Sequence, residues 1–545
     1  MQIDLGKKSR GAFFTPPPIA RFIARWAIRS GADRILEPSC GEAAFLLAAA
    51  GELSLLGSRL TDAGQLNGVE VHSLSAQAAE ESLAKLGVAT DIAVGDFFLR
   101  EPEKLYDAVV GNPPFIRYQE FAGVARARSL EAALAQGVRL SGLASSWAAF
   151  TIHASRFVSE NGRLGLVLPA ELLTVGYAAE VRRFLLRRFA KVRLVLFEQR
   201  VFPEVLEDTV LLLAEGTGKA SHFEVYQAKT AEDLSNLEIN GWMDHRPDSS
   251  DRWTPALLDV ATYGAFLDAT DSANVGHLSD WGSAYLGAVT GNNSFFCLND
   301  ELVERFQLGK TDIRPILPPG GRYLKGLTFS STAWNAHRKE NKRVFLFRPG
   351  ERPSSAAADY IAWGEERGVD KAYKCKMRSP WWRVPLTSCP DFVITYMNDE
   401  RVRFVQNASD ADILNSVYGF RLSQSFESEA SARHLPMSLL NSLTLLSAEL
   451  CGRVHGGGML KHEPRDFDKL VVPSRECLAN AREKLTAIEP QIGSLLRKSA
   501  VSEAVRLVDD ILLVEAAGLA PSIIGVVREA RERLFQRRRQ LGAKM

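Results

Sequence analysis

Short apolar runs alternate with helix-like segments through residues 1–216, and this alternation constrains the fold more than any other feature. The runs end in polar turns, as in RILEPSC, NGVEV, TDIAVGDF and YDAVVGNPPF, and patterns such as SLSAQAAEESLAKLG separate them. Strands that alternate with helices predict a parallel sheet with helices on both faces. We therefore expect an α/β fold with a first domain over residues 1–240. Further expected elements are helices over 18–31, 146–159 and 178–189 and a strand over 162–170.

The composition changes after about residue 275, where Gly, Pro and aromatic residues become frequent. Segments such as YLGAVTGNNSFF, LPPGGRYLKG and SPWWRVP indicate short, irregular strands between loops. The last part of the chain has a helical pattern and ends in RERLFQRRRQLGAKM. The sequence thus predicts a mixed α/β domain over 275–473 and a helical C-terminal segment over 474–545.

The charges of the chain nearly cancel, with 66 Lys and Arg against 65 Asp and Glu and a net charge of +1. This balance excludes a polybasic protein but not a nucleic-acid partner, because a local cationic cleft can lie on a neutral chain. The six cysteines form no Cys-x-x-Cys pair, which disfavours a zinc site and a disulfide scaffold, so no metal is expected. The chain has no apolar run of about 18 residues, and MQIDLGKKSRGAFFTPPP lacks the apolar stretch of a signal peptide. We expect a cytoplasmic protein without a membrane partner.

Acidic residues stand where the first three expected strands end, and ligands of open parallel sheets bind at such ends. Glu37 lies in the turn ILEPSCGEAAFL, whose glycine lets a ligand approach the backbone. Glu70 can accept hydrogen bonds from two ribose hydroxyls. Asp96 and Phe97 can hold an adenine by its amine and by its face. Each signal is weak alone, but the ordered set predicts a cofactor site.

The first turn also narrows the class of cofactor. It reads EPSCGEAAF and not Gly-x-Gly-x-x-Gly, which disfavours a dinucleotide. A cofactor with ribose and adenine but without phosphate fits this turn better. The sequence therefore indicates S-adenosylmethionine.

The segment Asn112-Pro113-Pro114-Phe115 ends the fourth expected strand and is the most specific signal in the chain. The lone pair of an exocyclic base amine is delocalised into the ring, so the amine is a poor nucleophile. The Asn112 side-chain oxygen and the Pro113 carbonyl could accept its two hydrogens and favour sp3 geometry. The prolines stiffen the turn and keep these acceptors preorganised, while Phe115 can stack on the base.

Together these segments resemble the gamma-class DNA adenine-N6 methyltransferases, the TaqI-type modification enzymes of restriction–modification systems, over about residues 11–473. The resemblance implies a Rossmann-like S-adenosylmethionine-dependent methyltransferase domain followed by a target-recognition domain. The N-terminal segment of the family is matched by GAFFTPPPIARFIARWA, and its Val-Phe-Pro segment by VFPEVLEDTVLLL. The implied cofactor-binding residues are Thr15, Glu37, Pro38, Ser39, Cys40, Glu70, Asp96, Phe97 and Pro114. The implied catalytic residues are Asn112, Pro113, Pro114, Phe115 and Phe202, of which Phe202 would stack on the flipped base.

The resemblance also implies the partners of the chain. The expected substrate is double-stranded DNA, from which the target adenine must rotate out of the stack. A separately encoded restriction endonuclease that acts on the same site is a possible partner, and the protein is expected to be a monomer. Basic residues on Gly-rich loops could contact DNA, and the candidates are Arg322, Lys325, Arg378, Arg383 and Lys461.

Other clusters in the sequence have simpler interpretations. Trp381 and Trp382 are expected in the core more than on a base, and the run Arg537-Arg538-Arg539 is expected at a solvated helix end. A basic run could face either DNA phosphates or water. It consists of Arg182, Arg183, Arg187, Arg188, Lys191 and Arg193.

Three alternatives stay open at this point. The chain could methylate another amide or amino group, in protein glutamine or RNA, although such enzymes need no recognition region of about 200 residues. It could combine methylation with restriction, although residues upstream of 11 and the C-terminal tail leave little room for a nuclease. It could also be an inactive DNA-binding regulator with a methylase fold, which the intact set of acidic residues disfavours.

Overall fold

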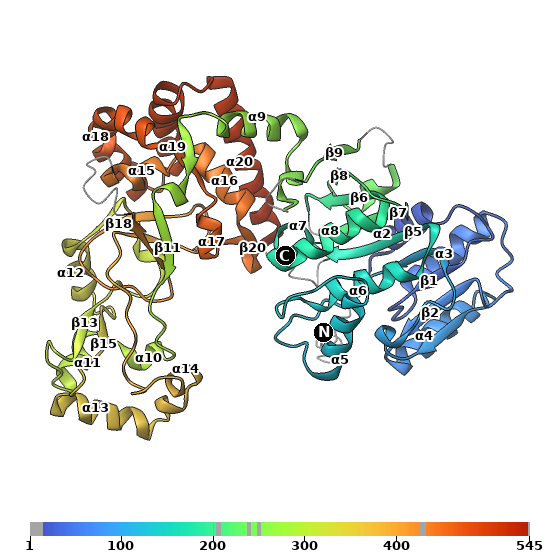
Figure 1. The fold of residues 1–545 in the computed structure, drawn as a ribbon, viewed down its shortest axis with the longest axis horizontal. Helices are drawn as coiled ribbons and strands as arrows, with labels where there is room; N and C mark the ends of the chain where they lie inside the picture. Colours follow the sequence, from blue (N-terminus) through green and yellow to red (C-terminus); the bar gives the residue numbers. More distant parts are fainter. Residues whose placement is uncertain are drawn as a thin grey trace. The chain divides into compact units, whose positions relative to one another are not determined.

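The computed structural model describes residues 15–199, 201–202, 209–236, 241–247, 252–423 and 432–542 (Figure 1). The chain forms two compact units. The first comprises Met1–Val260, His455–Gly458 and Gln536–Met545, and the second comprises Ala261–Val454 and Met459–Phe535. Residues after 474 therefore pack largely with the segment that precedes them, within the second unit.

The first unit is built on a nine-stranded sheet with the strand order β3-β2-β1-β4-β5-β7-β6-β8-β9. The five strands from β3 to β5 run parallel, as the strand–helix alternation predicts. Strand β7 is antiparallel to both β5 and β6. The strands are β1 Ile35–Glu37, β2 Leu66–Glu70, β3 Asp91–Val94, β4 Tyr106–Gly111, β5 Val158–Pro169, β6 Phe189–Phe197, β7 Thr209–Thr217, β8 Phe223–Ala228 and β9 Met243–His245.

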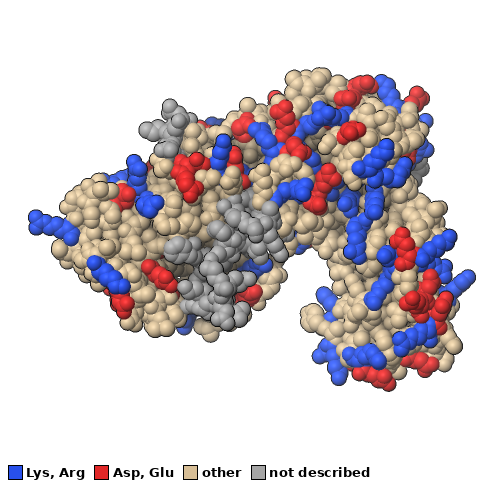
Figure 2. Space-filling view, turned by 180° about the vertical axis from the view of Figure 1, so that it is seen from behind, with Lys and Arg blue, Asp and Glu red and all other residues tan. Residues whose placement is uncertain are grey.

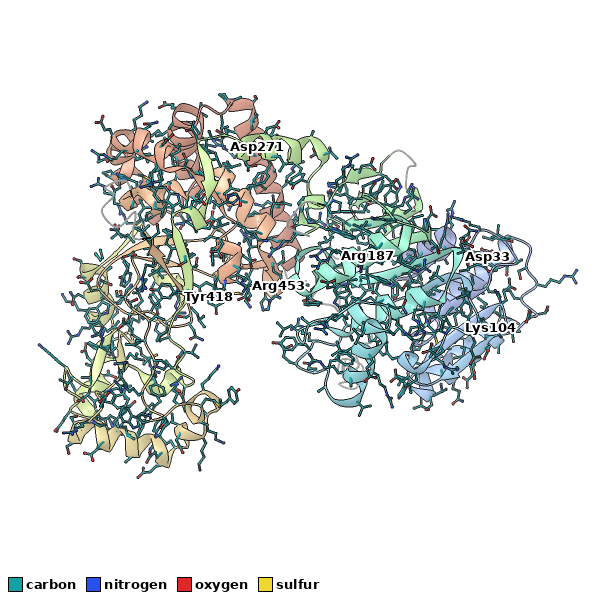
Figure 3. The ribbon with its side chains drawn as sticks, in the orientation of Figure 1. Asp33, Lys104, Arg187, Asp271, Tyr418 and Arg453 are labelled. Atoms are coloured by element: carbon teal, nitrogen blue, oxygen red, sulfur yellow. The ribbon has the colours of Figure 1, made fainter. Side chains whose placement is uncertain are left out.

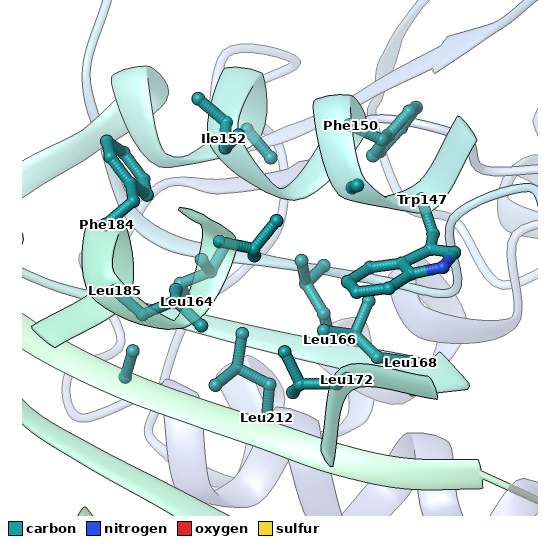
Figure 4. Packing of buried hydrophobic residues seen from close by; sticks show 14 of the residues in the cluster. Trp147, Phe150, Ile152, Leu164, Leu166, Leu168, Leu172, Phe184, Leu185 and Leu212 are labelled. Carbon is teal, nitrogen blue, oxygen red and sulfur yellow. The ribbon is translucent and has the colours of Figure 1, made fainter. Parts of the chain in front are cut away.

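Helices cover both faces of this sheet. The strand alternation separates two cores, because successive side chains point to opposite faces. Leu166 and Leu168 of β5 pack with Trp147 and Phe150 on one face (Figure 4), whereas Val167 belongs to the core of the other face. The helices are α2 Pro17–Ala27, α3 Ala44–Leu55, α4 Ser73–Ala84, α5 Gly123–Leu134, α6 Ser146–Ala154, α7 Glu171–Thr174 and α8 Ala179–Arg188.

Helix α2 shows how the sequence builds one of these layers. Pro17 begins the helix, where its fixed φ and missing N–H cost nothing. Ile19, Ile23 and Ala27 recur at helical spacing and are buried in the core that Val167 shares. The amphipathic pattern expected for residues 18–31 is therefore confirmed, with the helix ending at Ala27.

The second unit contains short strands, as its Gly- and Pro-rich sequence predicts. Its largest sheet has the order β11-β19-β16-β18-β14, and β15 lies between β12 and β13 in another. Strand β17 pairs with β21, and β10 with β22. The strands are β10 Val275–His277, β11 Gly282–Leu286, β12 Cys297–Leu298, β13 Ile313–Pro315, β14 Thr328–Ser330, β15 Phe345–Phe347, β16 Phe392–Ile394, β17 Met397–Asn398, β18 Phe404–Ala408, β19 Tyr418–Leu422, β20 Arg453–His455, β21 Met459–Lys461 and β22 Val471–Pro473.

Helices α9 to α20 follow β9 along the chain. None of the helices that the structure describes combines the length and hydropathy needed to cross a membrane. They are α9 Val260–Thr270, α10 Asn293–Phe296, α11 Asp300–Arg305, α12 Ser331–Lys339, α13 Ser355–Glu366, α14 Tyr373–Lys376, α15 Leu435–Ser438, α16 Ser442–Cys451, α17 Pro464–Phe467, α18 Arg475–Arg497, α19 Val501–Val508 and α20 Pro521–Gly542, with a π-helix η12 over Asp509–Ala516.

The C-terminal segment is helical, as predicted, and a buried carboxylate ties it to α16. Asp509 accepts hydrogen bonds from the Ser442 backbone N at 2.7 Å and the Ser442 hydroxyl at 2.6 Å. Arg528 Nη2 lies 2.8 Å from the same carboxylate. The expectation of a solvated arginine run at the helix end is wrong for Arg538, which is buried and donates to the Gly458 carbonyl at 2.7 Å. A buried carbonyl without a hydrogen bond costs free energy, and the Arg538 guanidinium avoids this cost by donating to the Gly458 carbonyl.

Candidate functional site

The predicted site residues of the first unit lie at the carboxyl ends of neighbouring parallel strands. Glu37 ends β1, Glu70 ends β2, and Asn112 directly follows β4. Asp96 comes two residues after β3. Because β3, β2, β1 and β4 are consecutive in the sheet, these four polar residues share one edge.

Glu37 is buried and holds the turn between β1 and α3 together. Its Oε2 accepts a hydrogen bond from the Leu46 backbone N at 2.9 Å. Burial raises the pKa of the Glu37 carboxyl well above its ordinary value, and hydrogen bonds from Leu46 and Phe45 offset this only in part. Its carboxylate therefore faces the first turn of α3, so its contribution to a ligand site is to shape the loop.

Glu70 joins two of the strand-end turns. Its Oε2 accepts from the Gly41 backbone N at 2.9 Å, and its Oε1 accepts from the His72 backbone N at 2.9 Å. Gly41 has a φ of 49°, which a residue with a side chain adopts less readily. A carboxylate offers about four acceptor positions, so Glu70 keeps capacity for the two hydroxyls of a ribose.

Cys40 lies on the inner side of the same turn and is buried. Its Sγ would lie 3.0 Å from a Cβ at position 68, so Gly68 in β2 leaves room for the thiol. Burial raises the pKa of the Cys40 thiol strongly, and repulsion by Glu37 adds to this. The thiol therefore stays neutral and acts as a packing group, not as a nucleophile.

The turn after β3 presents Asp96 with one oxygen committed to the backbone. Asp96 Oδ1 accepts from the Phe98 backbone N at 3.0 Å, and Oδ2 lies 3.2 Å from Arg128 Nη1 on α5. The Phe97 ring is buried against Phe150, with ring centroids 5.0 Å apart. The Phe97 ring therefore belongs mainly to the core. Sequence reasoning missed Arg128.

Hydrogen bonds brace the Asn-Pro-Pro-Phe loop at both ends. Asn112 Nδ2 donates to Thr15 Oγ1 at 3.2 Å, and the Ser39 hydroxyl donates to the Asn112 carbonyl at 3.2 Å. The Ser146 hydroxyl donates to the Pro114 carbonyl at 2.5 Å and accepts from the Ile116 backbone N at 2.9 Å. These contacts hold the loop in one geometry, as preorganised acceptors require.

Thr15, Ser39 and Ser146 come from three separate segments of the chain. The resemblance pointed to Thr15 and Ser39 as cofactor contacts, and the structure shows that both also touch Asn112. Ser146 was missed, because a serine at the start of α6 is also an ordinary helix-start residue. Only the fold shows that its hydroxyl reaches the Pro114 loop.

Trp147, the residue after Ser146, belongs to a second group of hydrogen-bonded side chains, together with Tyr177 and Glu171. Tyr177 donates to Glu171 Oε2 at 2.5 Å, and Trp147 Nε1 donates to the Tyr177 hydroxyl at 3.0 Å. Burial and the Glu171 carboxylate both raise the pKa of Tyr177 strongly. The tyrosine therefore stays neutral, and the group stiffens the segment that follows β5.

Phe115 and Phe202 both pack with the same hydrophobic core. Phe202 is 3% exposed and belongs to the core that Val167 and Phe197 share, and half-buried Phe115 packs against the same core. Pro203, which follows Phe202 in the Val-Phe-Pro segment, lies outside the described residues. Both aromatic candidates thus pack with the core on one face of the sheet, and the stacking role of Phe202 stays a prediction.

The basic run of the first unit contributes mainly internal contacts. Arg182 is buried and donates to the Leu172 carbonyl at 2.7 Å. Lys191 and Arg193 form ion pairs with Glu224. Arg187, labelled in Figure 3, is exposed. Arg182 therefore faces neither DNA nor water, because its guanidinium is buried and donates to a backbone carbonyl.

One group of possible metal ligands occurs among the described residues of the first unit. Ligand atoms of His222, Glu224 and Asp244 lie within 4.8 Å of one another. Glu224 is already paired with Lys191 at 2.9 Å and with Arg193. Two basic side chains thus supply the positive charge that a metal ion would bring.

The basic candidates of the second unit differ in their partners. Arg383 lies 3.2 Å from Glu351, and Lys461 lies 2.7 Å from Glu463. Arg322 is exposed and donates to the neighbouring Tyr323 hydroxyl at 3.1 Å, and Lys325 is exposed as well. Basic and acidic side chains alternate over the face drawn in Figure 2.

Arg378 and the two neighbouring tryptophans of this unit make internal contacts. Arg378 donates to the Val289 carbonyl, and burial lowers the pKa of its guanidinium. Trp381 and Trp382 are half-buried against a hydrophobic core, as predicted. The Trp381 indole N donates to Glu365 at 2.9 Å. These side chains therefore contribute mainly to folding.

Both parts of the chain are similar to known proteins. Residues 4–235 match the family model of N-6 DNA methylases, and residues 250–513 match that of the C-terminal domain of the type II methyltransferase M.Eco57I. The chain is 22% identical over 471 residues to the type II methyltransferase M.AccI of Acinetobacter calcoaceticus, with 85% of each chain covered. It is 26% identical over 487 residues to the type II methyltransferase M.XamI of Xanthomonas campestris pv. amaranthicola, with 86% of each chain covered.

A solved structure shares the fold over most of the chain. The type IIL restriction-modification enzyme MmeI, solved in complex with DNA, aligns with a TM-score of 0.61 and 15% identity. The alignment covers 93% of this chain and 73% of that chain. The Rossmann-like α/β fold expected from the sequence is confirmed.

Proposed function

Since residues 4–235 match the family model of N-6 DNA methylases and the chain is similar to type II methyltransferases over most of its length, we propose that it transfers a methyl group from S-adenosylmethionine to the N6 amine of an adenine in double-stranded DNA. The observation that carries this proposal is the bracing of the Asn-Pro-Pro-Phe loop beside the acidic strand ends. In this loop Asn112 Nδ2 donates to Thr15 Oγ1 at 3.2 Å, and Oδ1 is the other, acceptor end of the same amide.

The strand-end turns fit the ribose and adenine of the methyl donor. Glu70 spans two turns with two acceptor positions remaining, which suits the two ribose hydroxyls. Asp96 Oδ2 offers an acceptor to an adenine amine, in exchange for part of its contact with Arg128. The resemblance to the gamma-class enzymes puts Thr15 at the methionine end of the methyl donor in this proposal. S-adenosylmethionine, when bound, supplies an electrophilic methyl carbon.

The catalytic loop acts by geometry and hydrogen bonding. Asn112 Oδ1 and the Pro113 carbonyl accept the two hydrogens of the target amine, which makes its lone pair available. Ser146 donates to the Pro114 carbonyl at 2.5 Å, so the proposal takes the neighbouring Pro113 carbonyl as the second acceptor. Holding nitrogen and methyl carbon in line supplies much of the rate. The methylated nitrogen is acidic, so its proton leaves without a strong base.

The target adenine reaches this loop only after it leaves the duplex stack. Phe115 is half-buried beside Asn112 and can stack on one face of the base. Phe202 is the candidate for the other face, because it lies in the core against which Phe115 packs. The protein then acts in the cytoplasm, as a monomer, and protects DNA from a separately encoded endonuclease that recognises the same site.

Transfer of a labelled methyl group tests this proposal. The full chain is incubated with S-adenosylmethionine labelled at the methyl group and with DNA, RNA or protein as acceptor, and DNA products are digested to nucleosides. We expect label only in N6-methyladenine from DNA, and single-molecule sequencing should place it at one sequence. Label in RNA or glutamine would indicate another amino-group methyltransferase, and cofactor binding without transfer would indicate an inactive regulator.

A further inference from the structure

Three arginines meet in the second unit, where the turn between β17 and β18 approaches α20. Arg401 and Arg403 lie in this turn, and Arg531 Nη2 of α20 donates to the Glu400 carbonyl within it. Arg403 Nη1 donates to the Gly321 carbonyl at 2.8 Å. The cluster thus joins the turn, α20 and the loop that carries the sequence candidate Arg322.

The cluster has more arginine side chains than carboxylate groups to pair with them. Arg531 Nη1 lies 3.3 Å from Glu532 Oε2. Across the part of the chain that the structure describes, Arg401 and Arg403 lie within 4.0 Å of no carboxylate oxygen. Among the described residues, the Arg401 guanidinium donates one hydrogen bond, a long one of 3.4 Å to the Val402 carbonyl.

Burial makes this imbalance costly. The Arg531 side chain is 9% exposed, and its Nε has no hydrogen-bond partner among the described residues. Arg401 is half-buried, and burial, followed by repulsion from Arg403, lowers the pKa of its guanidinium to about 10, with Glu400 opposing and Arg531 adding to the shift. Charged groups withdrawn from water are stable only when they are paired and hydrogen-bonded.

We propose that Arg401, Arg403 and Arg531 form an anion site that holds a phosphodiester group of the bound DNA. The proposal rests on the proposed function, which supplies the DNA. Guanidinium groups match the oxygens of a phosphate through paired N–H donors, and a phosphate would also give the Arg531 Nε a partner. A phosphate contact positions the duplex and carries no sequence information.

The salt dependence of DNA binding measures this contact. The full chain with Arg401→Gln is titrated with a labelled duplex of mixed sequence, and the dissociation constant is followed by anisotropy from low to high salt. Loss of one phosphate contact should make the slope of log K against log salt shallower by about 0.9. Arg367→Gln is the matched control, because it removes an exposed arginine of the same unit that pairs with Glu366 at 3.6 Å.

Two more variants keep the test decisive. Arg401→Lys keeps the charge and loses the planar fork, so it should keep the parent slope and bind more weakly. If Arg401→Gln does not fold, as judged by its melting temperature and cofactor binding, then Arg403→Gln takes its place. A slope change no larger than that of Arg367→Gln would overturn the site.

Inorganic phosphate separates a free ion from the DNA backbone. If phosphate raises the melting temperature of the parent more than that of Arg401→Gln while the DNA slopes agree, then the cluster binds free phosphate and its role toward DNA is overturned. A parent protein that transfers no methyl group to DNA would refute the proposed function. If the parent methylates DNA and Arg401→Gln has the same salt slope as the parent, then only the phosphate site is refuted.

Discussion

The two units of this protein bring their functional residues together in different ways. In the first unit Glu37, Glu70, Asp96 and Asn112 each lie at or within two residues of a strand end, and four adjacent parallel strands place these ends on one edge. In the second unit the strands have two to five residues, and contacts such as Arg531 to Glu400 join positions 131 residues apart. A site at strand ends can therefore be recognised from local sequence, whereas a site made of turns and a distant helix cannot.

The largest effect is expected for a substitution at Asn112, which tests whether the strand-end loop of the first unit performs the chemistry. Asn112→Ala removes one preorganised acceptor, so methyl transfer should fall by about 10²–10³-fold, while S-adenosylmethionine affinity measured by calorimetry stays the same. Asn67→Ala is the control, because Asn67 is buried in β2 and donates to the Gly64 carbonyl at 2.8 Å. Retained transfer by Asn112→Ala in the radiolabel assay would remove Asn112 from the mechanism.

Ser146→Ala should have the next largest effect and tests the part of the loop that only the structure shows. It leaves the Pro114 carbonyl without its donor, which costs about 1–3 kcal/mol and should lower kcat about tenfold to a hundredfold. Affinity for S-adenosylmethionine should not change. Ser155→Ala removes a comparable buried hydroxyl that donates to the Ile152 carbonyl at 2.7 Å, and it should leave kcat unaffected. Equal kcat losses in both variants would point to general destabilisation.

The contrast between Asn112 and Ser146 shows how far the sequence alone reaches. Periodicity predicts the parallel strands and the helices of the first unit, because apolar spacing reports burial directly. Asn112 and the acidic residues follow strands and carry a recognisable pattern. Ser146 lies 30 residues from Ile116, and its role depends on the turn that brings α6 to the loop. Strands β8 and β9, and the Arg401 cluster, likewise depend on tertiary packing that local patterns do not record.

Phe202→Ala tests whether a residue that packs in the core also serves the chemistry of the loop. Loss of base stacking should cost about 1–3 kcal/mol in the flipped state, and 2-aminopurine at the target position should change its emission relative to the parent. Phe197→Ala is the control, since Phe197 is equally buried in the same core. If both variants lose thermal stability and leave the emission per folded molecule unchanged, then Phe202 only packs.

Glu37→Gln should have a smaller effect, on stability and its pH dependence. Burial raises the pKa of Glu37 above its ordinary value of 4.5, so the folded protein prefers the neutral carboxyl. Its contribution to the free energy of unfolding is full below pH 4.5 and is lost as the pH rises through the raised pKa. The variant should therefore melt higher than the parent at pH 8, and the two should converge toward pH 5. Glu103→Gln, at an exposed position, should follow the parent at every pH in differential scanning fluorimetry.

The smallest expected effects concern Arg322 and Arg383. Their different contacts in the structure rank them as DNA-binding candidates, which the sequence alone could not do. Arg322 is exposed and has a hydroxyl neighbour, whereas the charge of Arg383 is balanced by Glu351 at 3.2 Å. An exposed ion pair is weak, at about 0–1 kcal/mol, but a paired arginine releases fewer counterions from DNA when it binds. Arg322→Gln should therefore weaken duplex binding severalfold and lower the salt slope by up to about 0.9, and Arg383→Gln should change both less. The reverse order would show that ion pairs of the free protein do not indicate which loops of the second unit reach DNA.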